Sequence, residues 1–160
     1  MIKGLVVKNT RTGYFTDLRD VFNVLGDRFK DYNWLFSSYE TTNPNDVVPF
    51  EKDWVWLDGK TMYKLALDHE MQVIWGVLTA YKKEISQVQV MSHELPWADG
   101  NGQIWENPLT FQNPLCEIEI IPWDSSLLVI KSLDAEIIND FKKAYPVSQD
   151  LETYNDRMLN

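Results

Sequence analysis

Carboxylates and indole rings gather in one stretch of the sequence, from residue 91 to residue 130. This stretch has six acidic side chains and no Lys or Arg, so its formal charge is −6. Rigid indole rings anchor protein interfaces because they cover much apolar area, and acidic side chains around them attract a basic partner. The sequence therefore predicts an acidic-aromatic binding surface, with the candidate residues Trp97, Trp105, Glu94, Asp99, Glu106 and Asp124.

Two other functions fit the same residues. Tryptophan rings stack on sugars, and two of Glu94, Asp99 and Glu106 could form the carboxylate pair of a small hydrolase or carbohydrate binder. The two carboxyl groups lie about 5 Å apart in retaining glycosidases and about 6.5–9.5 Å apart in inverting ones. The aromatic residues could instead form the interface of a structural homodimer. The sequence leaves these alternatives open, but no catalytic motif supports an enzyme.

The segment Asp99-Gly100-Asn101-Gly102 resembles the middle of a calcium-binding EF-hand loop. Such a loop needs a carboxylate at its first position and a bidentate Glu at its twelfth. In this register the first position is Trp97 and the twelfth is Pro108. We therefore expect a tight glycine turn here and no calcium site.

The histidines and the cysteine give only weak signals for a metal site or a nucleophile. His69 and His93 are each followed by Glu, but neither has a second ligand four residues later, and zinc needs three or four ligands held together. Cys116 opens an apolar strand, which predicts a buried inert thiol; a catalytic pair with His93 is the weaker alternative. We expect no catalytic residue, no metal ion and no cofactor.

Length, charge and cysteine content narrow the classes of protein. The 160 residues carry a formal charge of −9, which argues against binding to a nucleic-acid backbone. No apolar run approaches the roughly 18 residues of a membrane span, and the first residues lack the pattern of a signal peptide. The single cysteine fits a reducing compartment. The sequence therefore predicts a cytoplasmic protein with no nucleic-acid or membrane partner.

Hydrophobic periodicity predicts the elements that must position these residues. Apolar side chains recur every three or four residues over 15–29, with Thr16 or Asp17 as a cap, and over 137–145, with Asp134 as a cap. These patterns predict the two main helices, and a brief third one follows Thr61. Strands are expected at 2–8, 32–37, 54–57, 71–81, 116–120 and 127–131, with a further edge segment at Val88 and Val90.

The strand at 32–37 is expected to bury one face, because Tyr32, Trp34 and Phe36 alternate with Asn33, Leu35 and Ser37. The strand at 116–120 is expected to be wet on one side, because Glu117 and Glu119 alternate with apolar residues. Residues 92–114 are expected to form a long loop with a small hairpin at 99–102. The resulting fold class is α+β: a single domain over 1–146, with an antiparallel or mixed sheet of five to six strands and two main helices on one face. Residues 147–160 are a polar tail that could dock through Leu151 and Tyr154.

The leading functional hypothesis is a small acidic interaction or inhibitor module, similar in kind to a bacterial immunity protein. It would act by occlusion of a basic partner. Trp97 and Trp105 would provide the apolar contacts, and the four candidate carboxylates would steer the encounter.

Overall fold

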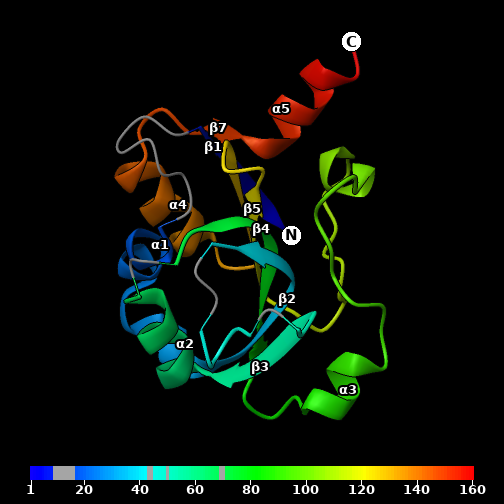
Figure 1. The fold of residues 1–160 in the computed structure, drawn as a ribbon. Coiled ribbons are helices and arrows are strands. Elements are labelled where there is room, and N and C mark those ends of the chain that lie inside the picture. The colour runs from blue at the N-terminus through cyan, green and yellow to red at the C-terminus, as the bar shows by residue number, and fades with distance from the viewer. Residues whose placement is uncertain (9–16, 43–44, 50, 69–70) are drawn as a thin grey trace.

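One seven-stranded antiparallel sheet forms the centre of the protein (Figure 1). The computed structural model describes residues 1–8, 17–42, 45–49, 51–68 and 71–160. Within these residues the strand order is β3-β2-β4-β5-β6-β1-β7, and all neighbouring strands are antiparallel. The strands are β1 (Lys3–Lys8), β2 (Tyr32–Thr41), β3 (Trp54–Asp58), β4 (Val73–Lys82), β5 (Ile118–Trp123), β6 (Leu127–Ser132) and β7 (Gln149–Asp150).

The α+β class is confirmed, but the prediction of five to six strands is wrong. The strand that the sequence did not reveal is β7, which has two polar residues and therefore no alternation to recognise. The prediction of two main helices is also too low. The described residues form five α-helices and two 3-10 helices: α1 (Leu18–Leu25), η1 (Gly26–Asp31), α2 (Gly59–Ala66), α3 (Gln87–Met91), η2 (Gly102–Trp105), α4 (Ala135–Ala144) and α5 (Leu151–Met158).

Helices α1 and α4 begin where the sequence placed their caps. Asp17 accepts a hydrogen bond from the backbone N–H of Arg19, and Asp134 accepts one from Glu136. The first pattern does not continue as one α-helix, because Gly26 has a φ of +60° and the chain tightens into η1. Phe29 is still buried, so the apolar period survives this change. Phe15 and Thr16, at the start of this pattern, lie outside the described residues.

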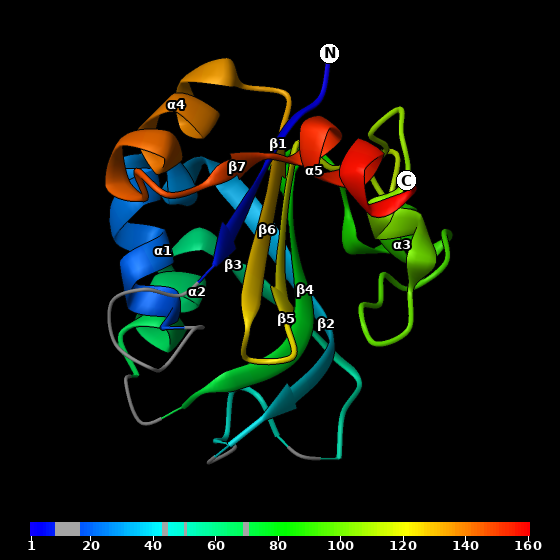
Figure 2. The ribbon, with the colours of Figure 1, turned by 90° about the horizontal axis from the view of Figure 1, so that it is seen from above.

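The two faces of the sheet have different covers (Figure 2). Helices α1, α2 and α4 cover one face, which we call the helical face. The other face is covered by residues 83–117, which run from β4 to β5 and include α3 and η2, and by α5. We call residues 83–117 the crossover segment and this side the crossover face. The helical face packs an almost entirely apolar core, with Phe22, Trp34 and Phe141 among its largest fully buried side chains.

Covering both faces overturns several local predictions. Strand β2 is buried on both sides from Trp34 to Ser37, so it has no wet face there. Glu119 in β5 was predicted to face water, yet it is fully buried under the crossover segment. Residues 87–91 form helix α3 and no edge strand, because Ser86 and Gln89 form a reciprocal capping box.

The end of the chain extends the sheet. Strand β7 pairs with β1, with Val6 opposite Gln149, and α5 follows at once. Leu151 is buried, and it approaches Gly4 so closely that a Cβ there would lie 2.8 Å from Leu151 Cδ2. Strand β7 therefore lengthens the sheet, and helix α5 packs on the crossover face.

Candidate functional site

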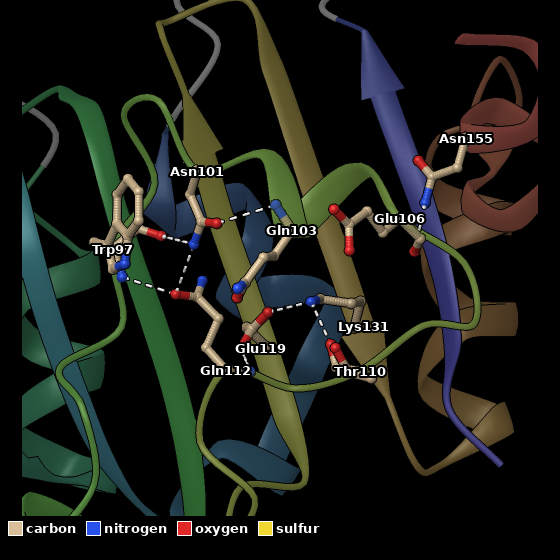
Figure 3. Close-up of polar contacts among 9 residues, drawn as sticks. All are labelled: Trp97, Asn101, Gln103, Glu106, Thr110, Gln112, Glu119, Lys131 and Asn155. Atoms are coloured by element: carbon tan, nitrogen blue, oxygen red, sulfur yellow. Dashed lines mark hydrogen bonds and ion pairs between the residues drawn. The ribbon is translucent and has the colours of Figure 1, made fainter. Parts of the chain in front are cut away.

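A buried ion pair holds the crossover segment to the sheet (Figure 3). Lys131 in β6 and Glu119 in β5 are cross-strand neighbours, and their side chains form an ion pair at 3% and 0% exposure. Lys131 Nζ also donates to the carbonyl of Thr110 at 2.7 Å, and Glu119 Oε2 accepts the N–H of Gln112 at 2.9 Å. Each buried charge thus reaches both its partner and the backbone of the segment above it. Charges in an apolar interior need such complete pairing.

The side chain of Gln112 then fixes the backbone at Trp97. Gln112 Oε1 accepts the N–H of Trp97 at 2.9 Å and Asn101 Nδ2 at 3.1 Å (Figure 3). Asn101 Nδ2 also donates to the carbonyl of Trp97 at 3.0 Å. The N–H and the C=O of Trp97 are therefore both bound by side chains. One of these, Asn101, is only 2% exposed, so little water competes for its bonds.

Asn101 also helps to determine the conformation of the glycine-rich segment 99–102, which resembles the middle of a calcium loop in sequence. Its Oδ1 accepts the N–H of Gln103 at 3.1 Å and caps η2. Gly100 adopts a φ of +79°, which a side chain would strain. The predicted hairpin at 99–102 is therefore wrong, and the segment is a glycine turn that leads into a 3-10 helix. Within the described parts of the chain, no group of three His, Cys, Asp or Glu side chains could hold a metal ion.

The indole of Trp97 projects from this fixed backbone and is 40% exposed. The preceding residue, Pro96, is buried, and its carbonyl accepts hydrogen bonds from the hydroxyls of Ser37 and Ser38 in β2. Glu94 and Asp99, two of the predicted binding residues, lie on either side of Trp97 in sequence and are exposed. The structure thus presents a large apolar ring between carboxylates on a backbone that is tied to β2 and to Gln112.

Trp105 has a different environment from Trp97. It is only partly exposed, and its ring lies edge-on to Trp123 at 5.0 Å between centroids and tilted against Tyr154 at 5.7 Å. Trp123 in turn contacts Trp75 edge-on at 4.8 Å. These four rings form an aromatic cluster that joins η2, the sheet and α5. Trp97 is outside this cluster, so the structure does not bring the two predicted anchors into ring contact.

The six acids of residues 91–130 separate into two groups. Glu119 pairs with Lys131 in the interior, and Glu117 pairs with Lys82 at 3.1 Å. The other four are exposed, and none of them forms an ion pair with a described residue: Glu94, Asp99, Glu106 and Asp124. These are the four carboxylates that the sequence selected. At two of them the nearby backbone is held by a hydrogen bond: the carbonyl of Glu106 accepts one from Asn155 Nδ2 at 3.2 Å, and next to Asp124 the N–H of Ser125 donates to the carbonyl of Ile74 at 3.1 Å.

The space beside Trp97 is small. A cavity of about 30 Å³ is lined by Glu94, Leu95, Pro96, Trp97, Gln103 and Gln112. This volume holds about two water molecules and no sugar ring. Cys116 is buried, and burial raises the pKa of its thiol above its usual value, so the thiol stays protonated. His93 is exposed, and His69 lies outside the described residues.

Sequence reasoning missed the residues that fix the site, namely Glu119, Lys131, Gln112 and Asn101. The sequence did contain a signal for the ion pair. Lys131 follows a run of apolar residues in its strand, and a short turn joins this strand to the one that holds Glu119. No protein-family model matches the chain, and comparison with curated proteins and with solved structures gave no match. In the part of the chain that the structure describes, no helix is both long and apolar enough to cross a membrane.

Proposed function

We propose that this chain is a small interaction module that masks a basic partner protein by occlusion, in the manner of a bacterial immunity protein. One observation carries the proposal: the four exposed carboxylates of residues 91–130 have no ion-pair partner among the described residues, whereas the two remaining acids are paired. Two of the four, Glu94 and Asp99, flank the exposed Trp97 in sequence, and the backbone of Trp97 is held on both sides. The buried lone Cys116 supports a reducing cytoplasm as the setting.

Trp97 acts as the anchor in this proposal, because it exposes more of its ring than Trp105 does. Interface tryptophans typically cost more than about 2 kcal/mol of binding free energy when they are truncated. The backbone of Trp97 is already bound through both its N–H and its C=O. Binding therefore costs little backbone entropy, which favours affinity. Trp105 supports the surface from below through the aromatic cluster.

The four carboxylates supply attraction at a distance. Their charges are exposed, so they affect the association rate and its salt dependence more than the lifetime of the complex. At physiological ionic strength this attraction extends about 8 Å, and at 1 M salt about 3 Å. A partner with a basic surface would therefore associate more slowly as salt rises, while the contact with Trp97 would persist.

The geometry gives less support to the two alternatives. A hydrolase or carbohydrate binder would need its carboxylates around a pocket for a sugar ring, and the cavity beside Trp97 has only about 30 Å³. A homodimer through the same surface would oppose two sets of unpaired carboxylates. Sedimentation at several protein concentrations tests the dimer, and a concentration-dependent mass that Trp97→Ala abolishes would replace the proposal with that alternative.

The test compares three variants in pull-downs from a lysate of the native organism, followed by binding kinetics with the purified partner. We expect capture of a basic protein that Trp97→Ala loses. Neutralising the four unpaired carboxylates should lower the association rate about 10-fold or more at low salt. The matched control neutralises four exposed acids outside the crossover segment, which are Asp20, Asp31, Asp46 and Glu136.

The control set changes the net charge by the same amount and should leave association nearly unchanged. If the control set and the neutralised set of Glu94, Asp99, Glu106 and Asp124 slow association equally, only the overall charge matters and the proposed surface is wrong. Capture that survives both Trp97→Ala and neutralisation of these four carboxylates would also reject it. Far-ultraviolet circular dichroism of each variant checks that the fold is intact.

A further inference from the structure

Strand β3 leaves an open edge on the sheet. It is five residues long and pairs only with β2 among the described residues. The opposite edge, β7, is two residues long and continues directly into α5. Proteins commonly shorten or cover edge strands because unpaired backbone groups can pair with another chain. Strand β3 is the longer and less protected of the two edges.

The register shows which backbone groups of β3 point outward. The N–H of Ser38 donates to the carbonyl of Asp53 at 2.7 Å. In an antiparallel ladder, residues bonded to the neighbouring strand recur at every second position. Val55 and Leu57 therefore face β2, where they lie opposite Phe36 and Trp34. The N–H and C=O groups of Trp54 and Trp56 face the open edge.

A groove of about 710 Å³ follows this edge. Its lining includes β3 from Trp54 to Leu57, together with Thr61 of α2 on one side and Gln87 of α3 on the other. Figure 1 shows β3 at the border of the sheet, with α2 and α3 on either side. The volume is in the range of binding sites, about 300–1,000 Å³. The groove thus combines two walls with an unpaired strand edge.

The side chains along the groove favour a basic occupant. Trp54 and Trp56 have the same parity, share one face of β3 and are partly exposed, so their rings can take cations at alternate positions. The charged residues that line the groove are Lys52 and Asp53, and residues 45–61 around it hold four acids and two lysines, net −2. One of these acids, Asp58, accepts the N–H of Thr61 at 2.7 Å, and this bond lowers the pKa of its carboxyl. A second copy of this chain would bring the same negative edge against itself.

We propose that the outer edge of β3 binds an extended, basic segment of another protein by β-strand addition. The segment pairs with the backbone of Trp54 and Trp56 and places Lys or Arg at alternate positions over their indole rings. Main-chain hydrogen bonds provide affinity in this mode, and alternate side chains provide specificity. This site is separate from the surface around Trp97 and does not depend on the function proposed for it.

Amide hydrogen exchange measured by nuclear magnetic resonance tests the proposal. The probe is a short peptide in which Arg and Val alternate, added to the full chain. Without peptide, the N–H groups of Trp54 and Trp56 should exchange faster than those of Val55 and Leu57, which are bonded to β2. With free peptide at about 100 times Kd, exchange at Trp54 and Trp56 should slow by about 100-fold. Equal rates at all four amides with and without peptide would overturn the proposal.

Two control peptides separate strand pairing from charge. The first has the same sequence with N-methyl groups on consecutive central amides, which removes the donors on both of its edges while its charge is kept. The second alternates Glu and Val. We expect neither to protect Trp54 or Trp56. If the N-methylated peptide binds as tightly as the parent, the contact is not strand addition, and if the acidic peptide binds as tightly, the occupant is not selected by charge.

Two variants locate the site. The double variant Glu51→Lys with Asp53→Lys should weaken binding of the basic peptide and strengthen binding of the acidic one, because both side chains are exposed beside the groove. Trp97→Ala should leave binding of the basic peptide unchanged. Loss of peptide binding in Trp97→Ala would show that the peptide binds at the surface around Trp97 and would overturn the inference. Slow exchange at Trp54 and Trp56 without peptide, with a dimer mass in sedimentation, would assign the edge to a second copy and also overturn it.

Discussion

The helical face and the crossover face of the same sheet are filled by different means. On the helical face, α1, α2 and α4 place apolar side chains such as Phe22 and Phe141 directly against the strands. On the crossover face, an irregular segment lies over the sheet, and a buried Lys131–Glu119 pair with the amide of Gln112 holds it. The first face is fixed by the fit of apolar shapes. The second combines apolar clusters, which include Val77, Ile104 and Leu151, with specific buried donors and acceptors.

The difference explains how an irregular segment can present a rigid surface. Backbone groups in a helix satisfy one another, but those of a loop need partners from elsewhere. The crossover segment receives them from Lys131 and Glu119 in the sheet and from its own side chains Gln112 and Asn101. Because each of these bonds has a fixed geometry, Trp97 is held in one position without a helix or strand of its own. Polar pairing thus adds to apolar packing on the crossover face, whereas the helical face depends almost entirely on apolar packing.

The largest effect is expected from breaking the buried ion pair. Lys131→Met leaves the carboxylate of Glu119 without its cation in a dry interior, and such changes cost about 3–5 kcal/mol of unfolding free energy. Urea denaturation followed by circular dichroism measures the loss. The exposed pair Lys30–Asp27 is the matched control, because Lys30→Met should cost about 1 kcal/mol or less.

A double variant separates the unpaired charge from lost packing. Lys131→Met with Glu119→Gln removes both charges and keeps an acceptor for the N–H of Gln112. It should be more stable than Lys131→Met alone. A double variant that is no more stable than the single one would mean that the crossover face is held by packing, as the helical face is.

The next prediction compares two apolar side chains, one on each face. Leu151→Ala and Ile137→Ala both remove a fully buried side chain and should each cost about 2–5 kcal/mol. Of these two residues, only Leu151 belongs to α5. Limited proteolysis should therefore cut the Leu151→Ala variant near its C-terminus, whereas the Ile137→Ala variant should resist cleavage there. The same cleavage pattern in both variants would show that α5 does not depend on the crossover face.

The sequence predicted the helical face better than the crossover face, for a physical reason. Apolar periods over α1 and α4, with caps at Asp17 and Asp134, specify a helix and the side that it buries. Glu117, just before β5, and Glu119, within it, alternate with Ile118 and Ile120. Alternation shows that the two faces differ in polarity, but it cannot show whether the polar one meets water or a buried lysine. Glu117 meets Lys82 at the surface, and Glu119 meets Lys131 inside.

The candidate site was predictable in its residues and not in its arrangement. The absence of Lys and Arg from residues 91–130 marked the four carboxylates that prove to be exposed without a described ion-pair partner. It could not separate Trp97 from Trp105, because both lie among Pro, Gly and acidic residues. Trp105 contacts Trp123 and Tyr154, which are distant in sequence. Those contacts depend on the docking of α5, which tertiary structure decides.

A smaller effect is expected from the amide that fixes Trp97. Asn101→Ala removes the cap of η2 and the bond to the carbonyl of Trp97, which should cost about 1–3 kcal/mol. Urea denaturation measures this loss. Backbone exchange at 97–103 should also become faster, while exchange in α4 should not. Asn23→Ala, an exposed position in α1, is the control, and it should change stability by about 0.5 kcal/mol or less.

The smallest effect belongs to the surface of the helical face and depends on pH. Asp140 on α4 lies 2.7 Å from the guanidinium of Arg28, and the hydrogen bond to Arg28 lowers the pKa of its carboxyl below the ordinary 3.8. The unfolded chain therefore binds this proton more readily than the folded chain. The resulting stability is present above pH 3.8 and is lost as pH falls from 3.8 through the lower folded pKa.

Arg28→Met should abolish that part of the acid dependence and shift the acid limb of the thermal melting curve only slightly, because Asp140 is exposed. Lys131→Met should lower the melting temperature across the whole range from pH 4 to pH 8. The contrast follows from where each charge lies. An exposed pair contributes a small amount wherever both partners are charged and loses it as Asp140 takes up a proton, whereas a buried pair is required wherever the fold persists. Similar pH profiles for the two variants would contradict the distinction between the faces.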